Sequence, residues 1–269
     1  MKSESDSTHG SLHGRRAFIT GASGHLGREF AHTLARRGCD LFLIDRNAVE
    51  LYELVEGLNL EFGVSVNFEC LDLEDFKSLH KVATSVANDS EPLNIIVNNA
   101  AFVGDSNLDG WTSDFQGQTV ETFRRAVEVN LTVPFGLSQI LYPKLSVSEG
   151  ANIVNISSIY GFLGPNNSLY SGTSLGNPAA YAASKGGLLQ LTRWMATSLA
   201  PKVRVNAISP GGIQRSQPQE FINRYEALTP LARMGRENDV CGALEFLTSD
   251  QASYVTGQNL IVDGGWSTW

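Results

Sequence analysis

The segment Ala17-Phe-Ile-Thr-Gly-Ala-Ser-Gly-His-Leu-Gly27 decides the fold of this chain. A short apolar run leads into three glycines and then into a helical pattern. A strand, a glycine turn and a helix start in this order point backbone N–H groups and a positive helix end at a phosphate. Gly21 would permit the tight turn, Gly24 the close approach of a pyrophosphate, and Gly27 the packing of helix against strand. A dinucleotide site is the prediction, although such a triplet alone is a weak signal.

Apolar runs and helical patterns alternate along the rest of the chain. Further strands are expected at 40–44, 64–70, 94–98, 151–156, 203–208 and 259–262, and helices at 48–62, 74–88, 120–145, 178–199, 219–228 and 237–247. Pro134 should kink the helix at 120–145. Short runs rich in β-branched residues are typical of strands buried on both faces. The alternation therefore predicts an α/β fold, a doubly wound parallel sheet of about seven strands with helices on both faces.

Composition and charge exclude several classes of protein. The 269 residues, 42% of them hydrophobic, are enough for one large domain. A net charge of −8 argues against nucleic acid and against an anionic membrane surface as partners. Three widely spaced cysteines show neither metal-ligand spacing nor a disulfide framework, so we expect no metal site and a cytoplasmic location. The polar residues 1–14 predict a disordered tail, and 15–269 a single domain.

Tyr181 and Lys185 are four residues apart in the helix expected at 178–199. That spacing places the phenol and the ammonium on one helix face, with Cβ atoms about 5–6 Å apart. A nearby cation lowers the pKa of a tyrosine by favouring the phenolate, which would make Tyr181 a usable acid or base. Taken alone, the pair is more often a surface tyrosine and a solvated lysine at chance spacing.

Asp45 ends the second expected strand, 24 residues after Gly21. An acidic side chain there accepts hydrogen bonds from an adenosine ribose and repels a 2′-phosphate, which favours NAD as cofactor. Arg46 supports the alternative, NADP, because a guanidinium beside the ribose can accommodate the 2′-phosphate.

The ordered set of motifs from about residue 16 to 265 resembles the short-chain dehydrogenase/reductase family, in its compact single-domain branch. Besides the glycine turn, the motifs are Leu71-Asp-Leu73, Asn98-Asn-Ala-Ala101, Val129-Asn130, Ile156-Ser-Ser158, Tyr181 with Lys185, Ser209-Pro-Gly211 and Val262-Asp-Gly-Gly265. Each motif is common, but the set is specific. The resemblance implies a Rossmann-type fold and an NAD(P)-dependent enzyme that interconverts a secondary alcohol and a ketone.

The resemblance also implies four catalytic residues. Tyr181 would exchange a proton with the substrate oxygen while hydride passes to or from the nicotinamide. Lys185 would hold the nicotinamide ribose and lower the pKa of Tyr181. Ser158 would hydrogen-bond the substrate oxygen. Asn130 would hold a water that relays protons between Lys185 and solvent.

The cofactor would lie along the carboxyl ends of the strands. Asp72 would meet the adenine amino group, or would instead cap the following helix. His25 receives no catalytic role. Arg215 stands where the family often has a threonine that contacts the nicotinamide carboxamide, and Ser216 could substitute for it. The cofactor-binding residues that we expect are Gly21, Ser23, Gly24, His25, Leu26, Gly27, Asp45, Arg46, Asp72, Leu73, Asn98, Ala100, Tyr181, Lys185, Pro210, Gly211 and Ile213.

Loops expected at 102–118, 162–180 and 212–230 bear on the substrate. The spacing from Ser158 to Tyr181 is longer than is usual in the family, which places an insert rich in Asn, Ser and Gly within 162–180. The first loop carries Trp111 among acidic and amide side chains. Because apolar rings stack on sugar faces and polar groups bind hydroxyls, we expect a sugar-like or polyol substrate. Alternatively, these loops only cover the sheet edge or join an oligomer contact.

Two other functions are open. A 3-oxoacyl thioester reductase would need a basic patch for an acidic carrier protein, and Arg124-Arg125 is a small candidate that the acidic balance of the chain opposes. A non-catalytic nicotinamide-binding sensor or scaffold is opposed by the intact catalytic set.

The family commonly forms homodimers or homotetramers through its two long helices. Trp266 and Trp269 would seal such a contact or belong to the core.

Overall fold

The computed structural model describes residues 11–103 and 108–269. Within them one parallel sheet has the strand order β3-β2-β1-β4-β5-β6-β7. Its strands are β1 (Arg16–Thr20), β2 (Asp40–Asp45), β3 (Val66–Cys70), β4 (Ile95–Asn98), β5 (Asn152–Ile156), β6 (Arg204–Pro210) and β7 (Asn259–Val262). The strands β2 and β3 are added on one side of β1, and β4 to β7 are then added in order on its other side. The predicted doubly wound sheet is confirmed, and its switch point lies between β1 and β4.

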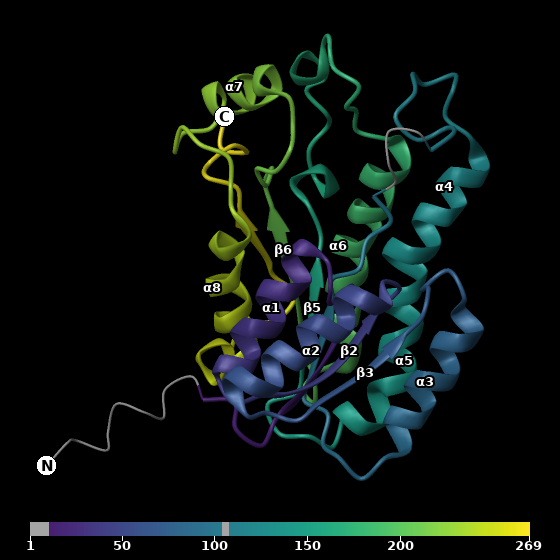
Figure 1. Ribbon diagram of the computed structural model, residues 1–269, viewed down its shortest axis with the longest axis vertical. Helices are drawn as coiled ribbons and strands as arrows, with labels where there is room; N and C mark the ends of the chain where they lie inside the picture. Colours follow the sequence, from purple (N-terminus) through teal and green to yellow (C-terminus); the bar gives the residue numbers. More distant parts are fainter. Residues whose placement is uncertain (1–10, 104–107) are drawn as a thin grey trace, which may run out of the picture.

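Helices cover both faces of the sheet (Figure 1). One face carries α1 (His25–Arg36), α2 (Ala48–Phe62) and α8 (Glu237–Thr248), and the other carries α3 (Phe76–Asn88), α5 (Val133–Leu145) and α6 (Ala179–Leu199), with α4 (Val120–Val127) packed on α6. Successive residues of β1 show the two layers, because Ala17 and Ile19 belong to one core cluster and Phe18 to the other. The helix α7 (Gln219–Ala227) lies beyond the carboxyl ends of the strands.

The helix expected at 120–145 is interrupted earlier than predicted. A π-helical turn, η1 (Glu128–Thr132), separates α4 from α5. Pro134 lies in the first turn of α5, directly after the π turn. The predicted kink at Pro134 stays a prediction, and the irregular turn beside it contains Asn130. Single π turns inside helices are frequent at functional sites.

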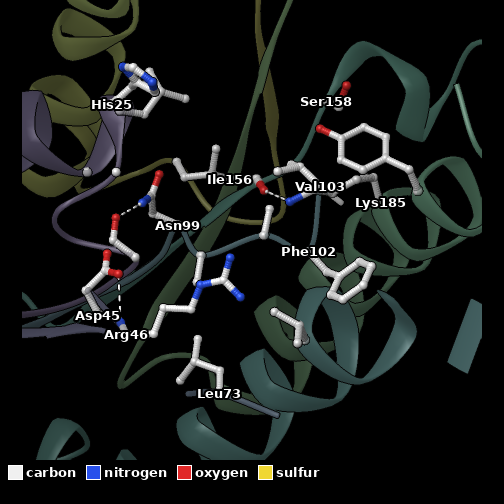
Figure 2. A pocket seen from close by; sticks show the side chains of 18 of the residues that line it. His25, Asp45, Arg46, Leu73, Asn99, Phe102, Val103, Ile156, Ser158 and Lys185 are labelled. Carbon is white, nitrogen blue, oxygen red and sulfur yellow. Dashed lines mark hydrogen bonds between the residues drawn. The ribbon is translucent and has the colours of Figure 1, made fainter. Parts of the chain in front are cut away.

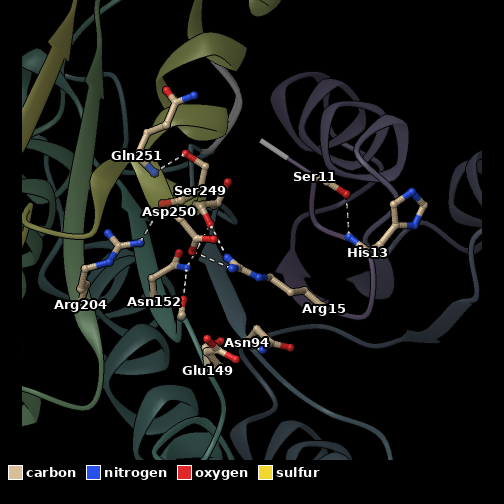
Figure 3. Close-up of polar contacts among 12 residues, drawn as sticks. Ser11, His13, Arg15, Asn94, Glu149, Asn152, Arg204, Ser249, Asp250 and Gln251 are labelled. Atoms are coloured by element: carbon tan, nitrogen blue, oxygen red, sulfur yellow. Dashed lines mark hydrogen bonds and ion pairs between the residues drawn. The ribbon is translucent and has the colours of Figure 1, made fainter. Parts of the chain in front are cut away.

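The folded domain begins earlier than the predicted boundary at residue 15. Leu12 is buried and its N–H donates to the carbonyl oxygen of Arg37. Residues 1–10 of the predicted tail lie outside the described residues. Figure 3 shows Arg15 reaching Asp250 at the amino ends of the strands, where Arg204 also donates to the carbonyl oxygen of Ser249. These contacts occupy the amino ends of the strands, so a site is expected at the opposite, carboxyl ends.

No helix in residues 11–103 and 108–269 is both long and apolar enough to span a membrane.

Candidate active site

A cavity of about 670 Å³ runs along the carboxyl ends of the strands. It is the position that a doubly wound sheet offers to a ligand, because the helices diverge there at the switch point. Most of the predicted site residues line it, although they come from seven separate segments of the chain. These residues are Gly21, Gly24, His25, Leu26, Gly27, Asp45, Arg46, Asp72, Leu73, Ala100, Ser158, Tyr181, Lys185, Pro210, Gly211 and Ile213.

Two of the predicted cofactor residues face elsewhere. The side chain of Asn98 donates to Asn155 Oδ1 at 2.8 Å, because the two residues are paired in register in β4 and β5. Asn99, which sequence reasoning missed, lines the cavity instead and could have been found as the first residue beyond the strand. Ser23 is buried and its backbone N–H donates to Asp45 Oδ2 at 2.9 Å.

The glycine turn has the shape that a phosphate site needs. Gly21 has a φ of +65°, and a Cβ on it would lie 2.8 Å from Ala100 Cα. A Cβ on Gly27 would lie 2.0 Å from the carbonyl oxygen of Gly21, so helix and turn pack too closely for any side chain. Gly24 directly precedes α1, and no side chain caps this helix end. The first residues of the helix line the cavity, so their N–H groups can bind an anion such as the pyrophosphate of a dinucleotide.

Asp45 supports the turn and faces the cavity. Its carboxylate accepts backbone N–H groups from Ser23, Arg46 and Asn47 at 2.9, 2.7 and 3.2 Å. An ionised carboxylate has about four acceptor positions, so one remains for a ribose hydroxyl. Figure 2 shows Asp45 beside Arg46 at one end of the cavity, with Lys185 and Ser158 at the other. The residues present therefore fit an extended dinucleotide.

Lys185 is buried and held in place by the sheet. Its Nζ donates to the carbonyl oxygen of Ile156 at 2.7 Å and lies 5.9 Å from the centroid of the Tyr181 ring (Figure 2). Burial lowers the pKa of Lys185 to about 8. Ser158 follows the end of β5, and its hydroxyl accepts the N–H of Tyr160, which fixes the side chain at the cavity. The three predicted catalytic residues Ser158, Tyr181 and Lys185 thus share one cavity end.

Burial and two neighbouring side chains shift the pKa of Tyr181. Burial raises the pKa of Tyr181, while its hydrogen bond to Ser158 and the positive charge of Arg215 lower it. The expected effect of Lys185 on this pKa stays a prediction: its ammonium donates to the carbonyl of Ile156 and lies 5.9 Å from the centroid of the Tyr181 ring. Arg215 lines the same cavity.

Asn130 is fully buried in the π turn. Its Oδ1 accepts the N–H of Phe102 at 2.6 Å, and its Nδ2 donates to Ser184 Oγ at 3.0 Å and to the Phe102 carbonyl at 3.3 Å. The side chain therefore joins the loop after β4 to α6, which carries Tyr181 and Lys185. The predicted water relay stays a prediction, and it would have to use the main chain of Asn130.

The loops expected to bind substrate take different positions. Trp111 is buried against Phe102, with ring centroids 5.2 Å apart, so the prediction that its indole meets a sugar was wrong. None of the described cavity-lining residues comes from 162–180. That insert forms a short 3₁₀ helix, η3 (Asn167–Tyr170), in which Leu169 is buried and Tyr170 packs on Phe221 of α7. The first and third loops do reach the cavity, the first through Phe102, Val103 and Leu108 and the third through Ile213 and Arg215.

Comparisons with known proteins agree with this architecture. Residues 21–267 match the family described as Enoyl-(Acyl carrier protein) reductase. A galactitol 2-dehydrogenase (L-tagatose-forming) from Cereibacter sphaeroides is 33% identical over 96% of this chain and 97% of its own length. A short chain dehydrogenase from Leptospira borgpetersenii, solved with bound NAD+, is 30% identical with a TM-score of 0.82, over 96% of this chain and 94% of that one. A gluconate 5-dehydrogenase from Burkholderia cenocepacia, solved with NADP and tartrate, is 25% identical with a TM-score of 0.85, over 98% and 99%.

The fold, the glycine turn and these likenesses define an oxidoreductase with a Rossmann-type nicotinamide dinucleotide site. The chain belongs to the short-chain dehydrogenase/reductase family, as its motifs indicated.

Proposed function

We propose that this protein is an NAD(P)-dependent alcohol dehydrogenase or ketoreductase that interconverts a secondary alcohol and a ketone. The observation that carries the proposal is the placement of Ser158, Tyr181 and Lys185 in the cavity that also contains the uncapped start of α1. A bound nicotinamide would supply the hydride chemistry.

The protein's own groups would move the proton. In the direction of reduction, the Tyr181 hydroxyl donates its proton to the carbonyl oxygen, and Ser158 donates a second hydrogen bond that orients the same oxygen. Because burial raises the pKa of Tyr181, the phenol is protonated at neutral pH and ready for this step. Lys185, fixed by the Ile156 carbonyl, would hold the nicotinamide ribose.

NAD is the cofactor that we propose. The remaining acceptor position of Asp45 suits an unmodified ribose, and its charge would repel a 2′-phosphate. Arg46 lines the same cavity and is exposed, which keeps NADP as the alternative. An Asp45→Ala variant should lose affinity for NAD more than for NADP, measured by equilibrium titration. Equal losses would contradict the assignment of Asp45 to the ribose.

A sugar-like or polyol substrate is supported by the relatives that act on galactitol and gluconate. The alternative, a 3-oxoacyl thioester reductase, is supported by the printed description of the family match. It is opposed by Arg125, because its Nε and Nη2 donate to the two carboxylate oxygens of Glu74 at 2.7 and 2.9 Å, which neutralises half of the candidate basic patch.

A panel of sugars, polyols, hydroxy acids and 3-oxoacyl thioesters, each with NAD and NADP and followed by nicotinamide absorbance, tests the proposal. We expect turnover of polyhydroxylated compounds and faster rates with NAD. Activity confined to thioesters would overturn the substrate class, and tight NAD binding without turnover of any compound would favour a sensor or scaffold.

We also propose a homodimer or homotetramer. Phe123, Phe135 and Trp194 on α4, α5 and α6 are 38%, 41% and 55% exposed, and such apolar groups on neighbouring helices are typical of an interface. Trp266 instead packs in a core cluster, and Trp269 is exposed. Light scattering of the native protein and of Trp194→Glu should show an oligomer and a smaller species. A monomeric native protein would contradict this proposal.

A further inference from the structure

Charged side chains of both signs line the cavity. Among the described residues, its carboxylates are Asp45 at the end of β2 and Asp72 and Glu74 after β3, and Arg46 and Arg125 line it as well. The described segments from β5 onward contribute Lys185 and Arg215 but no carboxylate. The charged groups that these later segments present to a substrate are therefore cations.

Arg215 makes two hydrogen bonds that leave part of its guanidinium available. Its backbone N–H donates to the side-chain oxygen of Gln217 at 2.6 Å, and the Gln217 amide donates to the Ile213 carbonyl at 2.8 Å, which braces the loop. Its Nε donates to Glu237 Oε1 at 3.2 Å. Within residues 11–103 and 108–269, the two Nη atoms have no hydrogen-bond partner. Their donors are therefore available to a ligand in the cavity.

A neighbouring arginine shows what a purely structural pair looks like in this region. Arg233 binds Asp239, also in the first turn of α8, through both Nη atoms at 2.6 and 2.9 Å, and does not line the cavity. Exposed pairs of this kind contribute little to stability. Arg215 has a similar carboxylate partner but offers it only Nε. Arg233 therefore uses both of its Nη atoms in a structural ion pair, whereas the Nη atoms of Arg215 are available to a ligand.

We infer that the substrate carries a carboxylate, which the Nη atoms of Arg215 receive while Ser158 and Tyr181 hold the reacting oxygen. A planar guanidinium matches a carboxylate with two parallel hydrogen bonds, which a neutral hydroxyl cannot replace at equal strength. The inference rests on the proposed function and narrows it from polyols to sugar acids and related hydroxy acids. Arg215 is then the residue that distinguishes an acid from the matching neutral alcohol.

Matched substrate pairs test this assignment. Each aldonate of four to six carbons is compared with the alditol of the same hydroxyl configuration, so that only the carboxylate differs. With the native enzyme and NAD, kcat/KM should be higher for the aldonate, and the advantage should shrink as ionic strength rises. Arg215→Gln should lower the aldonate-to-alditol ratio by about 10- to 100-fold. Arg215→Lys should keep part of the preference for the aldonate, and Arg233→Gln should give the same aldonate-to-alditol ratio as the native enzyme.

Three results would overturn the inference. In the first, alditols and aldonates have equal kcat/KM, and Arg215→Gln does not change the aldonate-to-alditol ratio. The proposed function would then stand without the inference about Arg215. Calorimetric titration could show that Arg215→Gln weakens NAD binding and leaves the ratio unchanged, which would assign Arg215 to the cofactor. If only acyl thioesters react, the proposed substrate class fails and the inference fails with it. Thermal unfolding of each variant confirms that it is folded.

Discussion

Replacing Lys185 with methionine should change the pH dependence of stability by a calculable amount. Burial lowers the pKa of Lys185 from 10.5 to about 8, and the side chain is only 2% exposed. Below pH 8 the amine is charged in both the folded and the unfolded protein, and the desolvation of the buried ammonium lowers the free energy of unfolding. Between these two pKa values the unfolded chain binds more protons, so the native stability rises with pH. From pH 7 to pH 10 the Lys185 contribution should rise by about 2.5 kcal/mol.

The assay is urea unfolding of the native protein and of Lys185→Met at several pH values in that range. The variant also leaves the Ile156 carbonyl without its donor, which costs about 1–3 kcal/mol at every pH. That constant term cancels when the difference between the two proteins is followed against pH. A difference that stays flat from pH 7 to pH 10 would refute the depressed pKa of Lys185, whatever the absolute stabilities are.

Two further predictions concern the turn and the insert. Gly27→Ala should destabilise the protein by about 1–3 kcal/mol and abolish measurable NAD binding, because its Cβ would lie 2.0 Å from the carbonyl oxygen of Gly21. Gly57→Ala in α2, where a Cβ meets nothing within 4 Å, is the control and should stabilise by up to about 1 kcal/mol in urea unfolding. Arg224→Met removes the 2.5 Å hydrogen bond to the Ser171 carbonyl, so amide exchange should accelerate at 162–180 and little elsewhere. Unchanged exchange in that segment would show that the insert is held by its apolar contacts alone.

The sheet and its order of elements were readable from local patterns. Buried parallel strands appear as short apolar runs such as Ile95–Val97, and a glycine turn before a helix has few alternatives. The break in the long helix was harder to place. A proline is the visible cause of a kink, whereas the π turn at Glu128–Thr132 has no comparable signature in the sequence.

The site residues show the same division. Ser158 could be placed at the cavity because it follows the end of a strand, whereas Tyr181 and Lys185 were assigned to it through the resemblance to the family. The contacts of loops could not be predicted, since they depend on tertiary packing. Trp111 packs in an apolar cluster, and Arg215 lines the cavity from a different segment.

The turnover of Tyr181→Phe tests the central claim most directly. The variant keeps the ring in the cavity and removes only the hydroxyl that would exchange the proton. With NAD and the best substrate of the panel, kcat should fall by about 10²- to 10⁴-fold while NAD affinity is kept. Tyr160→Phe is the matched control, because Tyr160 bonds the Tyr170 hydroxyl outside the cavity, and it should retain activity. Full turnover by Tyr181→Phe would contradict the account.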